Sequence, residues 1–249
     1  MNAVRNYQKE LDQIIEKTGA TDGCAPALFL HSCCAPCSSY VLEYLRQYFR
    51  ITVFYYNPNI TEDAEYRKRV AEQKRLIAAY NKKVTKKVNA DNSEIGMTCA
   101  YGAGASIQNA DGGGYEIRIV EGDYEPACFF EIAKGLEQCP EGGERCFACY
   151  ELRLRETARL AQEGGYDYFT TTLSISPLKN AAKLNEIGER LAAEYGVAWL
   201  PSDFKKKDGY KRSIELSREY GLYRQDYCGC VYSLVERERQ KEKQGTEVM

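Results

Sequence analysis

Seven of the eleven cysteines fall into three tight groups, and thiols at this density can bind a metal or carry out redox chemistry. The groups are CCAPC at 33–37, RCFACY at 145–150 and YCGC at 227–230. They contribute Cys33, Cys34, Cys37, Cys146, Cys149, Cys228 and Cys230. Disulfides are rare in a reducing cytosol, where clustered cysteines more often bind metal or react. The spacing therefore predicts a metal site.

The number of thiols narrows the kind of centre. A structural zinc or one cubane iron–sulfur cluster needs four protein donors, so seven thiols leave three spare. A second metal would need one more ligand, and Asp203 is the best carboxylate candidate because it directly follows a predicted strand. The alternative role for Asp203 is a helix N-cap. A structural zinc site and a thioredoxin-like dithiol remain alternatives, although each explains fewer of the cysteines.

The hydrophobic pattern places these groups at the ends of predicted elements. A buried strand at 27–31 runs into CCAPC, and a helix at 38–49 and a strand at 51–56 follow. Further along the chain we expect helices at 62–80, 149–163 and 178–195 and strands at 168–172 and 197–200. This alternation favours an α/β fold with a parallel sheet covered by helices on both faces. In such folds, sites form at the carboxyl ends of the strands.

The chain of 249 residues is expected to form a single catalytic domain over 1–235. A glycine-rich insertion is predicted at about 89–125, with a short hairpin strand at 115–120, and the tail at 236–249 is expected to be disordered. No leader opens the chain and no apolar run is long enough to span a bilayer, so we expect a cytoplasmic protein without membrane contact.

Four longer segments carry a family resemblance. LHSCCAPCS, ERCFACYELRL, FTTTLSISPLKN and LPSDFKKKDGYKRSIELSREYGLYRQDYCGCVYS together resemble the cobalamin-independent epoxyqueuosine reductases of the QueH type, over about residues 27–233. The resemblance implies a Rossmann-like fold of the HUP class. In related PP-loop enzymes a glycine-rich turn that binds phosphate follows the first strand, whereas this chain has CCAPC there, which argues against ATP.

The resemblance also implies an activity and its cofactors. The expected reaction is the reduction of epoxyqueuosine to queuosine at the wobble position of tRNA. It would use a 4Fe–4S cluster and an adjacent metal ion, expected to be iron, held by the seven cysteines and Asp203. A low-potential donor such as ferredoxin or flavodoxin is expected to supply electrons. The alternatives are a cluster-dependent, PP-loop-like tRNA sulfur transferase and a non-catalytic, zinc-dependent tRNA-binding module.

Two sets of side chains are expected to act on the substrate. His31, the only histidine, lies two residues before Cys33 and is a candidate proton donor, although a histidine bonded to backbone at a strand end is the alternative. The net charge of −2 gives no global sign of nucleic-acid binding, but residues 204–224 carry seven Lys or Arg against three Asp or Glu. Cations with interleaved aromatics can bind the anticodon loop, whereas a solvated helix face is the other interpretation. The predicted tRNA contacts are Lys179, Lys205, Tyr210, Arg212, Tyr223 and Arg224.

Overall fold

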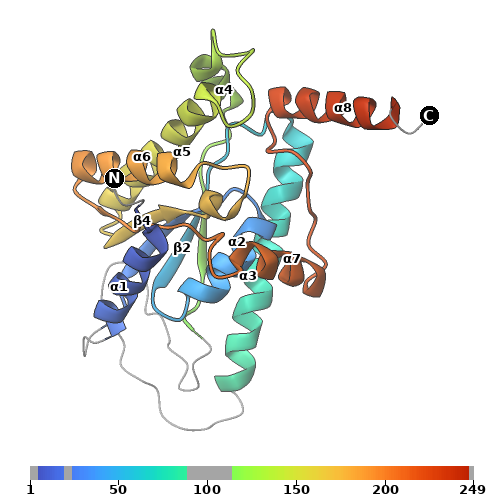
Figure 1. The fold of residues 1–249 in the computed structure, drawn as a ribbon. Helices are drawn as coiled ribbons and strands as arrows, with labels where there is room; N and C mark the ends of the chain where they lie inside the picture. Colours follow the sequence, from blue (N-terminus) through green and yellow to red (C-terminus); the bar gives the residue numbers. More distant parts are fainter. Residues whose placement is uncertain (1–4, 20–23, 89–113, 247–249) are drawn as a thin grey trace.

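A computed structural model describes residues 5–19, 24–88 and 114–246, and these residues form a parallel sheet with helices around it (Figure 1). The sheet has five strands in the order β3-β2-β1-β4-β5. They are β1 Ala27–His31, β2 Arg50–Tyr55, β3 Arg118–Glu121, β4 Tyr168–Thr171 and β5 Ala198–Trp199. The predicted α/β class is confirmed, while the HUP assignment stays a prediction.

The helices follow the strands in the alternation that the sequence predicts. They are α1 Tyr7–Gly19, α2 Ala35–Leu45, α3 Asp63–Val88, α4 Pro126–Ala133, α5 Glu144–Glu163, α6 Ala181–Tyr195, α7 Gly209–Glu219 and α8 Val231–Thr246, with a short 3-10 helix, η1, at Thr172–Ile175. The sheet order reverses between β1 and β4, and at such a switch point the loops after neighbouring strands diverge and leave a crevice.

Alternating side chains of β1 pack into two separate hydrophobic cores, as expected for a strand buried on both faces. Leu28 and Leu30 pack with residues of α2 and α3 on one face. Phe29 packs on the other face with residues of α5 and α6. Figure 1 shows α5 and α6 on one side of the sheet and α2 and α3 on the other. The sheet therefore holds β1, and the cysteines that follow it, between two layers of helices.

The structure corrects two expectations about irregular segments. Residues 118–121 form β3, which pairs in parallel with β2 rather than in a hairpin, because α3 provides a crossover long enough for parallel pairing. Residues 231–246 form α8, so the disordered tail predicted from residue 236 is wrong as far as residue 246. Glu, Lys, Arg and Gln are good helix formers, which explains why the helix continues past residue 235 without further apolar residues. Most of the predicted insertion, 89–113, lies outside the described residues.

In the part of the chain that the structure describes, no helix combines the length and the apolar character that crossing a membrane requires.

Candidate metal centre

The first cysteine group occupies the turn between β1 and α2. Cys34 is the N-cap of α2 in an extended conformation, and Pro36 lies in the first turn, where its missing amide costs no hydrogen bond. The Sγ atoms of Cys33, Cys34 and Cys37 all lie within 4.8 Å of one another. The backbone amide of Cys33 donates to Thr172 Oγ1 at 3.2 Å, which ties the turn to η1 across the switch point. These three thiols have the spacing of ligands to one centre.

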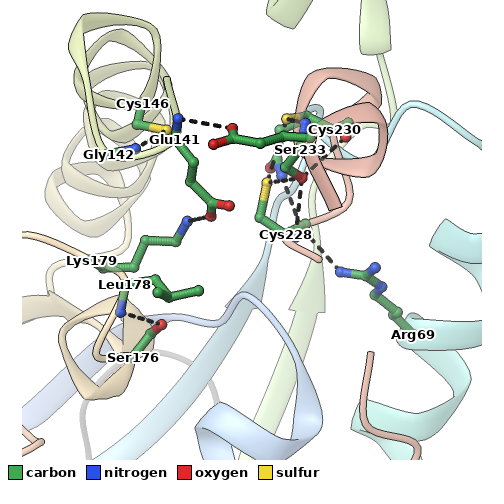
Figure 2. A network of polar contacts seen from close by, with 12 residues as sticks. Arg69, Glu141, Gly142, Cys146, Ser176, Leu178, Lys179, Cys228, Cys230 and Ser233 are labelled. Carbon is green, nitrogen blue, oxygen red and sulfur yellow. Dashed lines mark hydrogen bonds and ion pairs between the residues drawn. The ribbon is translucent and has the colours of Figure 1, made fainter. Parts of the chain in front are cut away.

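The second group lies in the first two turns of α5. This helix begins at Glu144, five residues before the start predicted from sequence, so Cys146 and Cys149 both lie near its N-terminus. Both side chains are buried, and the amide of Gly142 donates to Cys146 Sγ at 3.2 Å (Figure 2). Hydrogen bonds from amides near a helix N-terminus stabilise thiolate charge. The sequence-based prediction of a thiol pair at a helix start is confirmed.

The third group forms a tight loop before α8. Cys228 Sγ and Cys230 Sγ are 3.4 Å apart, and Ser233 Oγ lies 3.0 Å from Cys228 Sγ. Between them, Gly229 has φ +111°, which L side chains rarely adopt. A Cβ at this position would lie 2.7 Å from Ile60 Cγ1. Glycine is therefore required both by the backbone conformation and by the space beside the loop.

Residues of α3 and of the segment that follows β2 hold the Cys228–Cys230 loop in place. Arg69 of α3 donates through Nη1 to the carbonyl of Cys228 at 3.1 Å, as Figure 2 shows, and is itself paired with Glu65 at 2.7 Å. The amide of Thr61 donates to the carbonyl of Gly229 at 3.1 Å. The loop that follows β2 therefore positions cysteines that lie more than 160 residues further along the chain.

A cavity of about 370 Å³ connects the groups. Cys33, Cys34, Cys37 and Cys228 line it directly. Cys149 and Cys230 lie in one buried cluster against which Cys228 packs, and Cys146 belongs to the core against which Cys33 packs. Its ionic lining is mainly basic, with Arg69, Arg153, Lys179, Arg224 and Arg237 against Glu141 and Asp226. The structure thus brings the three cysteine groups of the sequence to one region.

Contacts among the thiols give neighbouring cysteines different pKa values. Neighbouring thiols, first Cys33 and then Cys37, hold the pKa of Cys34 well below its usual range. In the third group, the thiol of Cys230 lowers the pKa of Cys228 in the same way, and the charge of Lys179 adds to this effect. Each of these two groups therefore has one thiol that ionises before its neighbours. A thiolate is the form that binds metal.

The predicted tRNA contacts divide into two sets. Tyr210, Arg224 and Lys179 line the cavity. Lys179 does so as a buried ion pair, 2.8 Å from Glu141 and 8% exposed, rather than as a cation on the outer surface. Burial alone would lower its pKa, but the nearby Cys228, Tyr150 and Glu141 raise that pKa above its usual value.

The other three predicted contacts do not line the cavity. Arg212 donates to both carboxylate oxygens of Glu43 at 2.9 and 2.8 Å, which joins α7 to α2. The hydroxyl of Tyr223 lies 3.2 Å from the carboxylate of Glu65. Lys205 donates to the carbonyl of Ser174 at 3.1 Å. Each of these three side chains therefore has a polar partner within the protein.

His31 lies outside the cavity lining and is fully buried. Its Nε2 lies 3.0 Å from the carbonyl oxygen of Tyr56, which can only accept, so Nε2 carries the proton and Nδ1 accepts from Thr171 Oγ1 at 2.8 Å. Burial, assisted by the charge of Arg153, lowers the pKa of His31 to about 3. This placement argues against the predicted proton donor and favours the alternative, a neutral histidine bonded to the strand ends.

Asp203 follows β5 at the same sheet edge but is not among the residues that line the cavity. It is 15% exposed, with Lys205 Nζ 2.9 Å from its Oδ1. That oxygen is buried and accepts no hydrogen bond of good geometry from the described residues. The carboxylates in the cavity lining are Glu141 and Asp226, and Asp226 is paired with Lys241 at 2.6 Å.

Sequence reasoning missed several residues of the cavity lining, of which Arg153 and Leu178 matter most for the site. Arg153 is buried and follows Cys149 by one turn of α5, a spacing that places both on one face of the helix. Leu178 is 65% exposed on the turn after η1, beside Lys179 in Figure 2. The helical spacing from Cys149 could have indicated Arg153. The sequence holds no comparable signal for Leu178.

Together, the fold and the site define a doubly wound α/β protein with a thiol-lined cavity at the switch point of its sheet. The model of the family described as "Epoxyqueuosine reductase QueH" matches residues 28–101 and 104–236. The chain therefore belongs to the epoxyqueuosine reductase QueH family, which confirms the family and the enzyme class that the motifs predict.

Curated relatives agree with the family match. "Epoxyqueuosine reductase QueH" of Staphylococcus epidermidis is 42% identical over 232 residues, which is 92% of this chain and 85% of the relative. The protein of the same name from Streptococcus pyogenes is 38% identical over 228 residues, 92% of this chain and 78% of the relative. That of Thermotoga maritima is 32% identical over 210 residues, 84% of this chain and 91% of the relative.

Proposed function

We propose that the protein reduces epoxyqueuosine to queuosine at the wobble position of tRNA. The step takes up two electrons and two protons, breaks both carbon–oxygen bonds of the epoxide, forms a carbon–carbon double bond and releases the oxygen as water. The observation that carries the proposal is the convergence of three cysteine groups in a chain of this family: two groups line one cavity, and the third packs against both of them. A low-potential ferredoxin or flavodoxin is our proposed source of electrons.

The donor set fits a centre held by thiolates. Three Sγ atoms within 4.8 Å of one another and a further pair at 3.4 Å provide soft ligands of the kind that iron–sulfur clusters and iron require. We propose that four of the seven cysteines hold a 4Fe–4S cluster and that the others hold a second iron. When bound, such a pair supplies single electrons and a Lewis acid.

Asp203 remains our proposed oxygen ligand to the second iron. Its buried Oδ1, without a hydrogen-bond donor of good geometry among the described residues, is an atom that a cation would satisfy. Ser174 of η1 accepts from Lys205, the cation beside Asp203, and the neighbouring Leu173 and Ile175 of η1 line the cavity. Asp226 lines the cavity and, like Asp203, is paired with a lysine, but its side chain is 47% exposed, so its oxygens are open to water.

The remaining cavity residues give the chain its part in substrate binding. Tyr210 is 37% exposed and Leu178 is 65% exposed, so the lining includes an aromatic ring and an aliphatic side chain that solvent reaches. Proteins that recognise single-stranded RNA commonly stack an extruded base on such groups. Arg224, which also lines the cavity, adds a cation for the phosphate backbone. Deeper cations at Lys179 and Arg153 hold positive charge where the reaction adds electrons.

The direct test is turnover under anaerobic conditions. The protein is loaded with iron and sulfide and mixed with tRNA that contains epoxyqueuosine and with a low-potential reductant. Nucleosides are then quantified by mass spectrometry. We expect each epoxyqueuosine lost to appear as one queuosine, and a Cys228→Ser control to convert none. Intact epoxyqueuosine beside a fully loaded protein would refute the activity, and a thiolated base formed only with ATP would indicate the sulfur transferase instead.

A further inference from the structure

Arg153 is a buried cation in the wall of the cavity. It is 4% exposed and lines the same space as Cys33 and Cys228. Its Nε donates to the carbonyl of Cys149 at 3.2 Å, one turn earlier in α5. Its Nη1 donates to Asn57 Oδ1 at 3.2 Å, and Asn57 is itself buried and held by a bond from Nδ2 to the carbonyl of Ser32 at 2.8 Å. Both acceptors of Arg153 are therefore neutral oxygens.

A guanidinium in this position needs a compensating negative charge. Arginine stays protonated in proteins, and burying an unpaired charge is costly. Within residues 5–19, 24–88 and 114–246, no carboxylate lies within ion-pair distance of Arg153. The next arginine on α5, Arg155, differs, because it is half-exposed and pairs with both Glu151 and Glu194. The compensating charge for Arg153 must therefore come from another kind of group.

Thiols surround Arg153, whereas the two carboxylates that line the same cavity, Glu141 and Asp226, are paired with Lys179 and Lys241. Cys149 precedes the arginine by one helical turn, and Cys33 and Cys228 share the cavity lining with it. These residues represent all three cysteine groups. The arginine thus lies where three separate sets of thiolates would otherwise repel one another.

We propose that Arg153 is the fixed counter-charge of the centre that the three cysteine groups hold. Its guanidinium stabilises the thiolates together and raises the reduction potential of the centre, because a nearby positive charge favours the state with one more electron. Asn57 positions this charge without neutralising it, which a carboxylate at the same place would do. This inference rests on the proposed function for the identity of the centre. It assigns Arg153 a positioning and tuning role.

The test compares the midpoint potential of the loaded centre, measured by redox titration with electron paramagnetic resonance, in four variants. Arg153→Gln removes the charge and should shift the potential to more negative values. Arg153→Lys retains the charge and should restore most of that shift. Asn57→Asp keeps the size of the side chain, loses the bond to the Ser32 carbonyl, places a carboxylate beside the guanidinium and should also shift the potential downward. Arg155→Gln removes a charge from the exposed face of the same helix and should leave the potential unchanged.

A loading measurement and a second variant distinguish a failure of this inference from a failure of the proposed function. Iron and sulfide per chain are determined for every variant, and if Arg153→Gln fails to fold or to load, Asn57→Asp decides the question with the arginine still in place. An unshifted potential in loaded Arg153→Gln or Asn57→Asp would overturn the inference, as would an Arg153→Lys potential equal to that of Arg153→Gln. Wild-type protein without iron and sulfide would instead overturn the proposed function.

Discussion

The loop between Cys228 and Cys230 makes a sharp prediction, because Gly229 combines two separate requirements. Its φ of +111° is unfavourable for any residue with a Cβ, which costs about 1–3 kcal/mol. The added Cβ would also lie 2.7 Å from Ile60 Cγ1 and 3.2 Å from Arg69 Nη1, and overpacking of this kind costs about another 1–3 kcal/mol. We therefore expect Gly229→Ala to lower the free energy of unfolding by roughly 2–6 kcal/mol.

The chain offers a matched control in Gly221. Its φ of +55° is also positive, but no atom lies within 4 Å of the position a Cβ would take. Gly221→Ala should therefore cost only the backbone part, about 1–2 kcal/mol. The difference between the two variants reports the steric contact of Gly229 with the loop after β2 together with the less favourable φ of Gly229. Because that contact positions two thiols, Gly229→Ala should also lower the iron bound per chain, whereas Gly221→Ala should not.

The assay is urea denaturation followed by circular dichroism, with iron and sulfide measured on the same anaerobic samples. A total stability of about 5–15 kcal/mol is typical of a folded domain, so losses of the expected size are resolvable. The reasoning fails if Gly229→Ala is no more destabilising than Gly221→Ala. It also fails if Gly229→Ala binds as much iron as the wild type.

Two further substitutions test the carboxylate ligand and the cavity rim. Asp203→Asn should lower the iron per chain while the sulfide per chain stays constant. Asp226→Asn, which removes a carboxylate paired with Lys241, should leave the iron and the sulfide unchanged. Iron lost from Asp226→Asn and retained in Asp203→Asn would reject Asp203 as the ligand. Leu178→Ser removes an exposed apolar contact worth about 1–2 kcal/mol when a base covers it, so KM for tRNA should rise about 5- to 30-fold with metal content unchanged. Val120→Ser, on exposed β3, is the control, and an equal effect there would contradict a specific role for Leu178.

Local patterns predicted much of the fold because they reflect local physics. The apolar run at 27–31 is a strand buried on both faces, and Pro36 suits the first turn of the helix that follows. The parallel pairing of 118–121 was not predictable in this way, since it depends on a long crossover and on the partner strand. From residue 236 on, α8 has no apolar stripe, and without that periodic signal its sequence is also typical of a disordered tail.

The site shows the same division. Thiol spacing predicted the three cysteine groups, because each is encoded within a few residues. Which residues of the basic segment 204–224 face the cavity depends on the fold. Tyr210 and Arg224 line the cavity, whereas Arg212 pairs with Glu43 of α2, which is 169 residues away in sequence. No local pattern distinguishes a cation that faces a substrate from one that faces a carboxylate on a neighbouring helix.

The central claim is that three cysteine groups, distant in sequence, form one iron–sulfur site. The most direct test is the iron and acid-labile sulfide content of anaerobically purified wild type and of Cys33→Ser, Cys149→Ser and Cys228→Ser. Cys139→Ser, which belongs to none of the three cysteine groups, is the control. We expect the wild type and Cys139→Ser to contain both iron and sulfide, and each of the other three to lose one or both. Zinc without sulfide in the wild type, or full iron and sulfide in any of those three variants, would contradict the claim.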